Sequence, residues 1–491
     1  MIDTGVNRTV VAARALDETL RAQLVIDLSS GFKGPLIHPD SAGYDVARAV
    51  WNGLIDKHPG LIARCVDTKD VVIAVNAARR LGVAVAVRGG GHSVAGKSHV
   101  DGGLTIDLSL MRRVQVDVAQ HVVHAEGGCL LKDLDEATEP HGLAVPLGTV
   151  SETGLGGLAL GGGAGWLTRK HGLTCDNFHS VEVVTANGEI VEASPERHPS
   201  LFWALRGGSG NFGIVTRFTL RAHRLGPPMR IGVSLYRPED AAQALGEYAA
   251  LAPTLPRIVG WHGALKRHMP PLPFVPDHLV GERLLMLFSM WLADAGDPES
   301  VKYAERLCRT GNPCLTTMTV LPFGTGMQKA LDPEFADGHR YYTKQFHLGA
   351  LSTEIVRLLV DFWATMPMRG EAQIIQLGGA MTDVPEDGSA FANRAVPWWL
   401  NVVLHWDDAA CDDAYFDQTC EFAVKLTPHV APGAYINSLN ADEADRVVDA
   451  YGGPQKYTRL GRLKARYDPH NLFRINHNIE PVHLSTAAGS R

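Results

Sequence analysis

His92 is the residue of this chain best suited to covalent chemistry. It follows three glycines in the segment Arg88-Gly-Gly-Gly-His-Ser, directly after an apolar run at residues 83–87. A tight loop with little side-chain cover leaves an imidazole exposed, and such a group can act as a nucleophile. A single histidine is more often structural, so this role depends on the pattern around it.

Two glycine runs, at residues 89–96 and 154–165, could hold a phosphate group. Successive backbone N–H groups in tight turns bind anions, and glycine lets a ligand approach the backbone closely. Each run alone would suit an ordinary turn equally well. The two together, with Arg88 beside the first, favour a large phosphorylated cofactor.

The segment at residues 208–213 matches the G-x-G-x-x-G fingerprint of nicotinamide-dinucleotide sites letter for letter. That fingerprint requires a helix after the glycines, with its N-terminus facing the pyrophosphate. Here the strand-like sequence IVTRFTL follows instead. The context therefore argues against a nicotinamide cofactor.

Composition narrows the function classes. The net charge of −7 argues against a general binder of nucleic acid or of anionic membranes. The seven cysteines lie far apart, and neither they nor the 21 histidines show metal-ligand spacing, so we expect no metal. The N-terminal residues lack a long apolar segment, and no apolar stretch approaches ~18 residues, so a soluble cytoplasmic protein is expected.

The hydrophobic pattern predicts an α+β protein in three segments. Residues 1–60 look mostly helical, and the following segment alternates strands with helices. Beyond residue 226 glycine thins and proline rises, which indicates a second domain. We expect a first domain over 1–225, an inserted domain over 226–431 and a C-terminal return over 432–491. The elements expected in the first domain are a helix at 69–80, strands at 83–87 and 102–109, a hairpin at 114–128, a helix at 131–141 and strands at 181–186 and 214–222.

Five segments together resemble one enzyme family. They are VRGGGHSVAG (87–96), DGGLTIDLS (101–109), GLALGGGAGWLTRKHGLTCDN (157–177), LFWALRGGSGNFGIVTRF (201–218) and YDPHNLFRINHNI (467–479). They are similar to the FAD-linked oxidases of the vanillyl-alcohol oxidase superfamily, in the berberine-bridge-enzyme-like branch. The resemblance implies a bipartite FAD-binding domain of the PCMH type. It also implies an inserted α+β substrate domain, an antiparallel sheet covered by helices.

The resemblance also implies which residues bind FAD. His92 corresponds to the histidine bonded to the flavin 8α-methyl carbon. Many members add a second bond from a cysteine, but Val150 stands at that position, so a single covalent link is expected. Asn476 and Asn478 could instead cap the Asp-Pro turn before them. The cofactor-binding residues implied are Arg88, Gly89, Gly90, Gly91, His92, Ser93, Gly96, Gly148, Thr149, Gly154, Gly157, Gly161, Gly210, Ile214, Val215, Asn476 and Asn478.

Substrate chemistry is expected from the inserted domain and the return segment. By resemblance, Gln376 lies on a strand that faces the flavin, and Tyr435 and Asn437 match the family's Tyr-x-Asn signature. Ser438 stands where carbohydrate-oxidising members often carry an aromatic base, which weakens a sugar-oxidase interpretation. No nearby carboxylate, Asp383 and Glu386 included, is favoured as a base. The tryptophans Trp398, Trp399 and Trp406 could line an apolar pocket, although an interior strand core explains such residues more often.

The leading hypothesis is an FAD-dependent oxidase that takes a hydride from a C–H bond beside nitrogen or oxygen. The substrate would be a small amine, alkaloid-like compound or alcohol, and dioxygen would reoxidise the flavin to give hydrogen peroxide. Thr153 occupies the position that gates oxygen in the family, and threonine there leaves the acceptor open. Alternatives are a carbohydrate or alcohol oxidase, a dehydrogenase, and a non-catalytic flavin-binding protein. The expected partners are the substrate and dioxygen, with no nucleic acid and no membrane; a homodimer is the default symmetric expectation.

Overall fold

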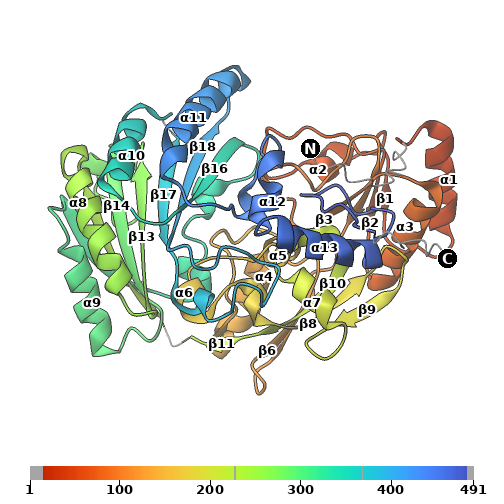
Figure 1. Cartoon of the computed structure of the whole chain (residues 1–491), viewed down its shortest axis with the longest axis horizontal. Coiled ribbons are helices and arrows are strands. Elements are labelled where there is room, and N and C mark those ends of the chain that lie inside the picture. Colours follow the sequence, from red (N-terminus) through yellow and green to blue (C-terminus); the bar gives the residue numbers. More distant parts are fainter. Residues whose placement is uncertain (1–14, 226–227, 368, 484–491) are drawn as a thin grey trace, which may run out of the picture.

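The computed structural model describes residues 15–225, 228–367 and 369–483. Within them, strands and helices alternate in the first part of the chain, and a large antiparallel sheet with its own helices follows (Figure 1). The predicted α+β class is therefore confirmed. The division at 225 and 431 stays an interpretation of the chain.

A four-stranded sheet carries the first glycine turn. Its strand order is β1-β2-β4-β3, with β2, β3 and β4 parallel and β1 antiparallel to β2. The amphipathic helix α3 (Thr68–Leu81) packs beside it, capped by Asp67 and ended by Gly82 in the left-handed conformation. The chain leaves β3 directly into the glycines before His92. The strands are β1 (Leu36–Ile37), β2 (Leu61–Arg64), β3 (Val85–Arg88) and β4 (Leu104–Asp107).

A five-stranded antiparallel sheet follows, in the order β5-β6-β10-β8-β9. The predicted hairpin is confirmed, because β5 and β6 pair across the turn near Ala119. Strand β10 directly follows the 208–213 glycines, which confirms that a strand and not a helix stands there. The strands are β5 (Val114–Asp117), β6 (Val122–Glu126), β8 (Phe178–Val184), β9 (Ile190–Ala193) and β10 (Ile214–Arg221), with a separate pair β7 (Leu143–Ala144) and β11 (His223–Arg224).

The third sheet has seven antiparallel strands in the order β15-β12-β14-β13-β17-β18-β16. Figure 1 shows helices on its outer side, so its other face is directed toward the rest of the molecule. The strands are β12 (Met229–Tyr236), β13 (Val259–Lys266), β14 (Leu284–Trp291), β15 (Leu315–Leu321), β16 (Arg340–Leu348), β17 (Gly370–Gln376) and β18 (Trp398–Trp406). The helices are α8 (Pro238–Leu251), α9 (Pro298–Cys308), α10 (Thr353–Thr365) and α11 (Asp412–Leu426).

The C-terminal segment returns to the first part of the chain. The buried Lys464 ammonium, on α13 (Pro454–Tyr467), donates to the Asn211 carbonyl at 2.7 Å. The Ile479 N–H donates to the Asn211 side chain at 2.9 Å. The remaining helices are α1 (Glu18–Ser29), α2 (Tyr44–Arg48), α4 (Leu131–Thr138), α5 (Leu155–Leu160), α6 (Thr168–His171), α7 (Pro199–Leu205) and α12 (Val447–Ala450).

The prediction of a mostly helical N-terminal segment is wrong where the structure describes it. Residues 15–60 contain only α1 and the five-residue α2, with β1 between them. Four helix-breaking residues explain the difference. Gly34, Pro35, Pro39 and Gly43 interrupt a polar stretch whose composition otherwise resembles that of a helix. Residues 1–14 lie outside the described residues.

Candidate active site

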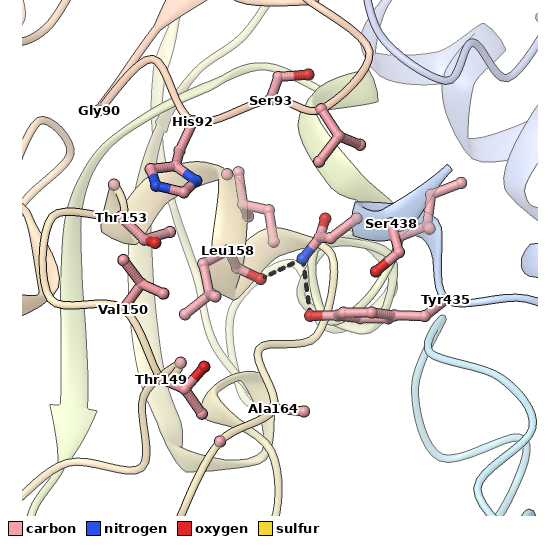
Figure 2. Close-up of a pocket in the computed structure, with 18 of the residues that line it drawn as sticks. Gly90, His92, Ser93, Thr149, Val150, Thr153, Leu158, Ala164, Tyr435 and Ser438 are labelled. Carbon is pink, nitrogen blue, oxygen red and sulfur yellow. Dashed lines mark hydrogen bonds between the residues drawn. The ribbon is translucent and has the colours of Figure 1, made fainter. Parts of the chain in front are cut away.

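One cavity of about 460 Å³ brings the two glycine runs together with the inner face of the seven-stranded sheet. Its walls come from the turn after β3, the 148–168 segment, strands β13, β14, β17 and β18, and residues 435–438. Figure 2 shows His92, Val150 and Thr153 on one side of the cavity and Tyr435 and Ser438 on the other. A site of this composition can hold a cofactor and a small substrate side by side.

Most of the predicted residues line this cavity. Those that do are Gly89, Gly90, Gly91, His92, Ser93, Gly148, Thr149, Gly154, Gly157, Gly210, Ile214, Val215, Gln376, Tyr435, Asn437 and Asn476. These residues come from segments that are far apart in the sequence. At the glycine positions the backbone itself lines the cavity, because glycine has no side chain to cover it.

Four predicted residues do not line the cavity. The Arg88 side chain turns away and donates to the Ala47 carbonyl, so only its backbone continues into the turn. Gly96 has a left-handed backbone (φ 64°) beneath the side chain of Ile55. Gly161 lies behind the cavity wall, where a Cβ would come 1.9 Å from the Asn437 Oδ1. Asn478 accepts a hydrogen bond from the Tyr457 hydroxyl through its carbonyl.

The His92 imidazole is buried and neutral. Burial lowers its pKa to about 4. Within the described residues its Nε2 has no hydrogen-bond partner. The ring stacks on the indole of Trp51, with centroids 4.3 Å apart and planes 15° apart. An unprotonated ring with an unused nitrogen lone pair is the form in which histidine acts as a nucleophile.

Tyr435 and Asn437 form a hydrogen-bonded pair at the opposite wall. The Tyr435 hydroxyl oxygen accepts from Asn437 Nδ2 at 2.9 Å and from the Gly163 N–H at 3.1 Å (Figure 2 shows the first). The same Asn437 amide donates to the Leu158 carbonyl at 3.0 Å. Burial raises the pKa of Tyr435 to about 12, so its hydroxyl is protonated at neutral pH.

Gln376 lies at the end of β17 and is buried. Its Nε2 donates to the Ala252 carbonyl, which fixes the side-chain amide. Its Oε1 is buried and finds no donor among the residues described. The register opposite Trp398 places this side chain on the face of the sheet that packs on the helices, so Gln376 reaches the cavity wall only at the strand's end.

A row of polar side chains crosses the inner face of the sheet, and the sequence reasoning missed it. This polar row consists of Lys266 on β13, Glu371 and Gln373 on β17, and Asn401 on β18. The register places Lys266 opposite Glu371 and Gln373 opposite Asn401. A signal existed, because Glu371 and Gln373 are two apart on one strand and so share one face.

The charged end of the polar row is an ion triad. The Lys266 Nζ lies 2.5 Å from the Glu371 carboxylate and also contacts the Glu334 carboxylate. Lys266 is 3% exposed, and its pKa is raised above the ordinary value because the attraction of both carboxylates outweighs burial. Gln373 donates to Glu371 at 2.5 Å. With both carboxylates ionised, the triad has one excess negative charge; burial raises the pKa of Glu334 and so opposes that charge.

The three tryptophans divide between the two roles considered. Trp399 lines the cavity and stacks on Tyr435 with centroids 4.6 Å apart. Trp398 packs against Tyr248, and Trp406 packs against Tyr415, both in the core under the helices. Adjacent strand residues point to opposite faces, which separates Trp398 from Trp399.

The carboxylates of the loop after β17 do not line the cavity. Asp383 is exposed and pairs with Arg257 at 2.7 Å. Glu386 is exposed and accepts from the backbone N–H groups of Asn393 and Arg394. Among the described residues that line the cavity, Glu371 is the carboxylate and no cysteine occurs. Val150 lines the wall where a second flavin link would need a thiol.

The cavity suits FAD on structural grounds. Glycine backbones from both runs line it, and at Gly157 and Gly210, which also line it, a Cβ would meet no protein atom within 4 Å. The unpartnered His92 Nε2 and Asn476 Oδ1 are buried polar atoms that a ligand could satisfy. Lys97 also lines the cavity and can offset phosphate charge.

Comparison with known proteins gives two family models. Residues 59–194 match the model of the FAD binding domain, and residues 434–480 match the model described as berberine and berberine like. Within the described residues, no helix is both long and apolar enough to cross a lipid bilayer.

Two curated relatives and two solved structures align along nearly the whole chain. An FAD-linked oxidoreductase of Dictyostelium discoideum is 30% identical over 94% of this chain and 97% of its own. The (R)-6-hydroxynicotine oxidase of Paenarthrobacter nicotinovorans is 29% identical over 91% of this chain and 97% of its own. The crystal structure of 6-hydroxy-D-nicotine oxidase from Arthrobacter nicotinovorans superimposes with a TM-score of 0.81 and 26% identity, covering 92% of this chain and 99% of that one. The xylooligosaccharide oxidase of Myceliophthora thermophila shares the fold, with a TM-score of 0.80, 23% identity, and 95% and 100% coverage.

Proposed function

Because this chain belongs to the FAD-linked oxidoreductases of the berberine-bridge-enzyme-like family, we propose that it oxidises a small amine at the C–H bond beside nitrogen. It is an FAD-dependent enzyme that acts on a small molecule. The observation that carries the proposal is the single cavity that joins the glycine turns to the polar row. FAD, when bound, accepts the hydride at N5 and passes the electrons to dioxygen, which gives hydrogen peroxide.

The polar row and its neighbours favour a substrate that donates hydrogen bonds. The Asn401 Oδ1, in the polar row, is a buried acceptor without a partner among the described residues. With both carboxylates ionised, the triad of Lys266, Glu371 and Glu334 carries one excess negative charge at the wall, and buried charges interact more strongly than exposed ones. An amine supplies both the donors and the complementary charge.

Tyr435 acts in this proposal as a positioning group for the substrate. Its hydroxyl oxygen already accepts from Asn437 and Gly163, so its own proton is free to donate toward the cavity. Because its pKa is about 12, the hydroxyl does not serve as a base at neutral pH. Oxidation of an amine requires no O–H proton to be removed, but an amine that binds as the cation must lose an N–H proton to solvent before hydride transfer, and the Tyr435 phenol takes no part in that loss.

We propose one covalent bond to FAD, through His92. The neutral, buried imidazole supports this role, and so does Val150 at the position where a second link would require cysteine. Two further expectations stay proposals. A cytoplasmic location agrees with seven free cysteines, and a homodimer is the default symmetric state.

A carbohydrate or alcohol oxidase is the main alternative. The amides of Gln373 and Asn401 could hydrogen-bond hydroxyl groups as well as amines, and the xylooligosaccharide oxidase shares the fold. Ser438 in place of an aromatic base argues against it. A dehydrogenase and a non-catalytic flavin protein are the other outcomes.

One panel experiment separates these functions. The purified protein is mixed anaerobically with secondary and tertiary amines, primary and secondary alcohols, and mono- and oligosaccharides, and flavin absorbance is followed. Bleaching by an amine supports the proposal, and peroxide release in air supports dioxygen as acceptor. Bleaching only by sugars supports the alternative. Bleaching without peroxide indicates a dehydrogenase, and no bleaching by any compound supports the non-catalytic protein.

A further inference from the structure

A column of stacked rings lies behind the His92 imidazole. The Trp51 ring stacks on His92 at 4.3 Å and on Tyr341 at 4.0 Å, with planes 15° and 20° apart. Two rings at these distances cannot share one face of an indole, so His92 and Tyr341 lie on opposite faces of Trp51. His405 continues the column, at 5.4 Å from Tyr341.

Trp51 is held firmly from both sides. Its Nε1 donates to the Phe335 carbonyl at 2.8 Å, and its backbone N–H donates to the Gly91 carbonyl at 3.2 Å. Its own carbonyl accepts from the Gly338 N–H at 2.9 Å. The next residue, Asn52, bridges both backbone groups of Tyr341, each at 2.9 Å. The indole is therefore fixed between the glycine turn and strand β16.

His92 itself has few other restraints. It follows three glycines, and its Nε2 has no hydrogen-bond partner among the described residues. In most histidine sites a hydrogen bond to one ring nitrogen fixes the ring's orientation. Here the ring contacts its own backbone, and the stacked indole supplies a flat surface that fixes the plane of the imidazole.

We propose that Trp51, supported by Tyr341, is the positioning residue for attachment of FAD to His92. This inference rests on the covalent link proposed above. In the attachment, a bond forms between an imidazole nitrogen and the flavin 8α carbon. One C–H bond of the methyl group and the imidazole N–H bond are broken. The two protons and two electrons released reduce the flavin, and dioxygen then takes them as hydrogen peroxide. Correct orientation of reacting atoms accounts for large rate factors in such steps.

The test measures attachment rather than turnover. Full-length protein produced under riboflavin limitation is mixed with FAD in air. Acid-precipitable flavin is followed over time, and the mass of the peptide that contains His92 is measured. Total bound FAD is determined before precipitation. We expect Trp51→Leu to bind FAD at wild-type stoichiometry and to attach it at least tenfold more slowly. Trp51→Phe keeps a flat ring and should stay within threefold of wild type.

Trp291→Leu is the matched control. Trp291, on β14, is an equally buried indole, but it is not among the residues that line the cavity and it stacks on Tyr303 instead of His92. This variant should attach FAD at the wild-type rate. A second variant, Tyr341→Leu, removes the support behind the indole and should slow attachment less than Trp51→Leu does.

Any of the following results would overturn the inference. Attachment by Trp51→Leu at the wild-type rate shows that the stack does not orient His92. Failure of both Trp51 variants to bind any FAD shows a role in cofactor binding or folding instead. If wild-type protein releases all its flavin in acid, the covalent link of the proposed function fails first, and the inference falls with it.

Discussion

Gly90 and Gly154 approach each other so closely that neither position has room for a side chain. A Cβ on Gly90 would lie 2.5 Å from the Gly154 nitrogen, and one on Gly154 would lie 2.3 Å from the Gly90 nitrogen. The two glycine runs are therefore in backbone contact with each other. Here glycine is required for packing between two loops of the protein, in addition to any contact with a phosphate.

Gly154→Ala should unfold or severely destabilise the region around the cavity. The clashing atoms are backbone atoms, which cannot move aside as a flexible side chain can. We expect a loss of about 3 kcal/mol or more in the free energy of unfolding, together with loss of bound FAD. Urea denaturation and flavin absorbance measure the two effects.

Gly246→Ala is the matched control for this prediction. Gly246 lies inside helix α8, and a Cβ there would meet nothing within 4 Å. Alanine should stabilise the protein by about 0.5–1 kcal/mol, because it lowers the entropy of the unfolded chain and favours the helix. Equal behaviour of the two variants would contradict the packing argument.

Tyr435→Phe tests whether the hydroxyl positions the substrate or acts as a base. The pKa of about 12 keeps the phenol neutral through pH 6–10, so its removal should lower kcat/KM about tenfold without changing the pH profile. Steady-state kinetics with an amine found by the panel measure this. Loss of an inflection between pH 7 and 9 in the variant would show that Tyr435 is a base after all.

Glu371→Gln tests the charge of the polar row. The substitution removes the excess negative charge, while Lys266 keeps Glu334 as a partner, so the fold should persist. We expect KM for a cationic amine to rise about tenfold and KM for a neutral alcohol to change less than twofold, in keeping with a charge-assisted hydrogen bond of about 1.5 kcal/mol. Gln373→Glu, the reciprocal change on the same face, should lower KM for the cationic amine. Equal effects on both substrates would favour a purely structural role for the triad.

The sequence predicted the cofactor half of the site better than the substrate half. Glycines mark the cofactor half because a backbone cradle depends on residue type alone, as at Gly90 and Gly148. The substrate half depends on which strands lie side by side. Lys266 and Glu371 are far apart in the chain, and only the β13–β17 register brings them together.

The importance of Trp51 could not be predicted from the sequence for the same reason. It lies in a stretch predicted as helix, and its importance depends on contacts with the glycine turn and with β16. The sequence suggests Trp399 and its neighbour Trp398 equally as cavity residues. Only the structure shows which face of the sheet is turned toward the cavity, and so which of the two lines it and which lies in the core.

The stability of the apoprotein should fall steeply in mild acid. Burial lowers the pKa of His92, His347, His405 and His477 to about 4, and that of His262 to about 3. In the unfolded chain these rings bind protons near pH 6.5, but in the folded protein they do not until about pH 4. The contribution of these neutral rings to the free energy of unfolding is therefore complete above pH 6.5 and is lost as the pH falls toward 4.

Urea midpoints measured between pH 7 and 4.5 test this expectation. His262→Gln removes one such ring and should reduce the slope of the free energy against pH by up to ~1.4 kcal/mol per pH unit. A flat profile in the wild-type protein would contradict the prediction.

The buried ion pair of Lys464 and Asp468 should be essential for the C-terminal return. The two charges lie 2.6 Å apart, and both side chains are 0% exposed. Lys464 also donates to the Phe473 carbonyl at 2.8 Å, close to the Asn476 that lines the cavity. Lys464→Met leaves Asp468 as an unpaired buried charge, which costs about 3–5 kcal/mol. We expect a fall of that size in the free energy of unfolding and weaker FAD binding.

Arg257→Met, which breaks the exposed pair with Asp383, should cost less than about 1 kcal/mol and leave FAD bound. Similar losses in the two variants would show that burial of the pair is not what anchors the segment.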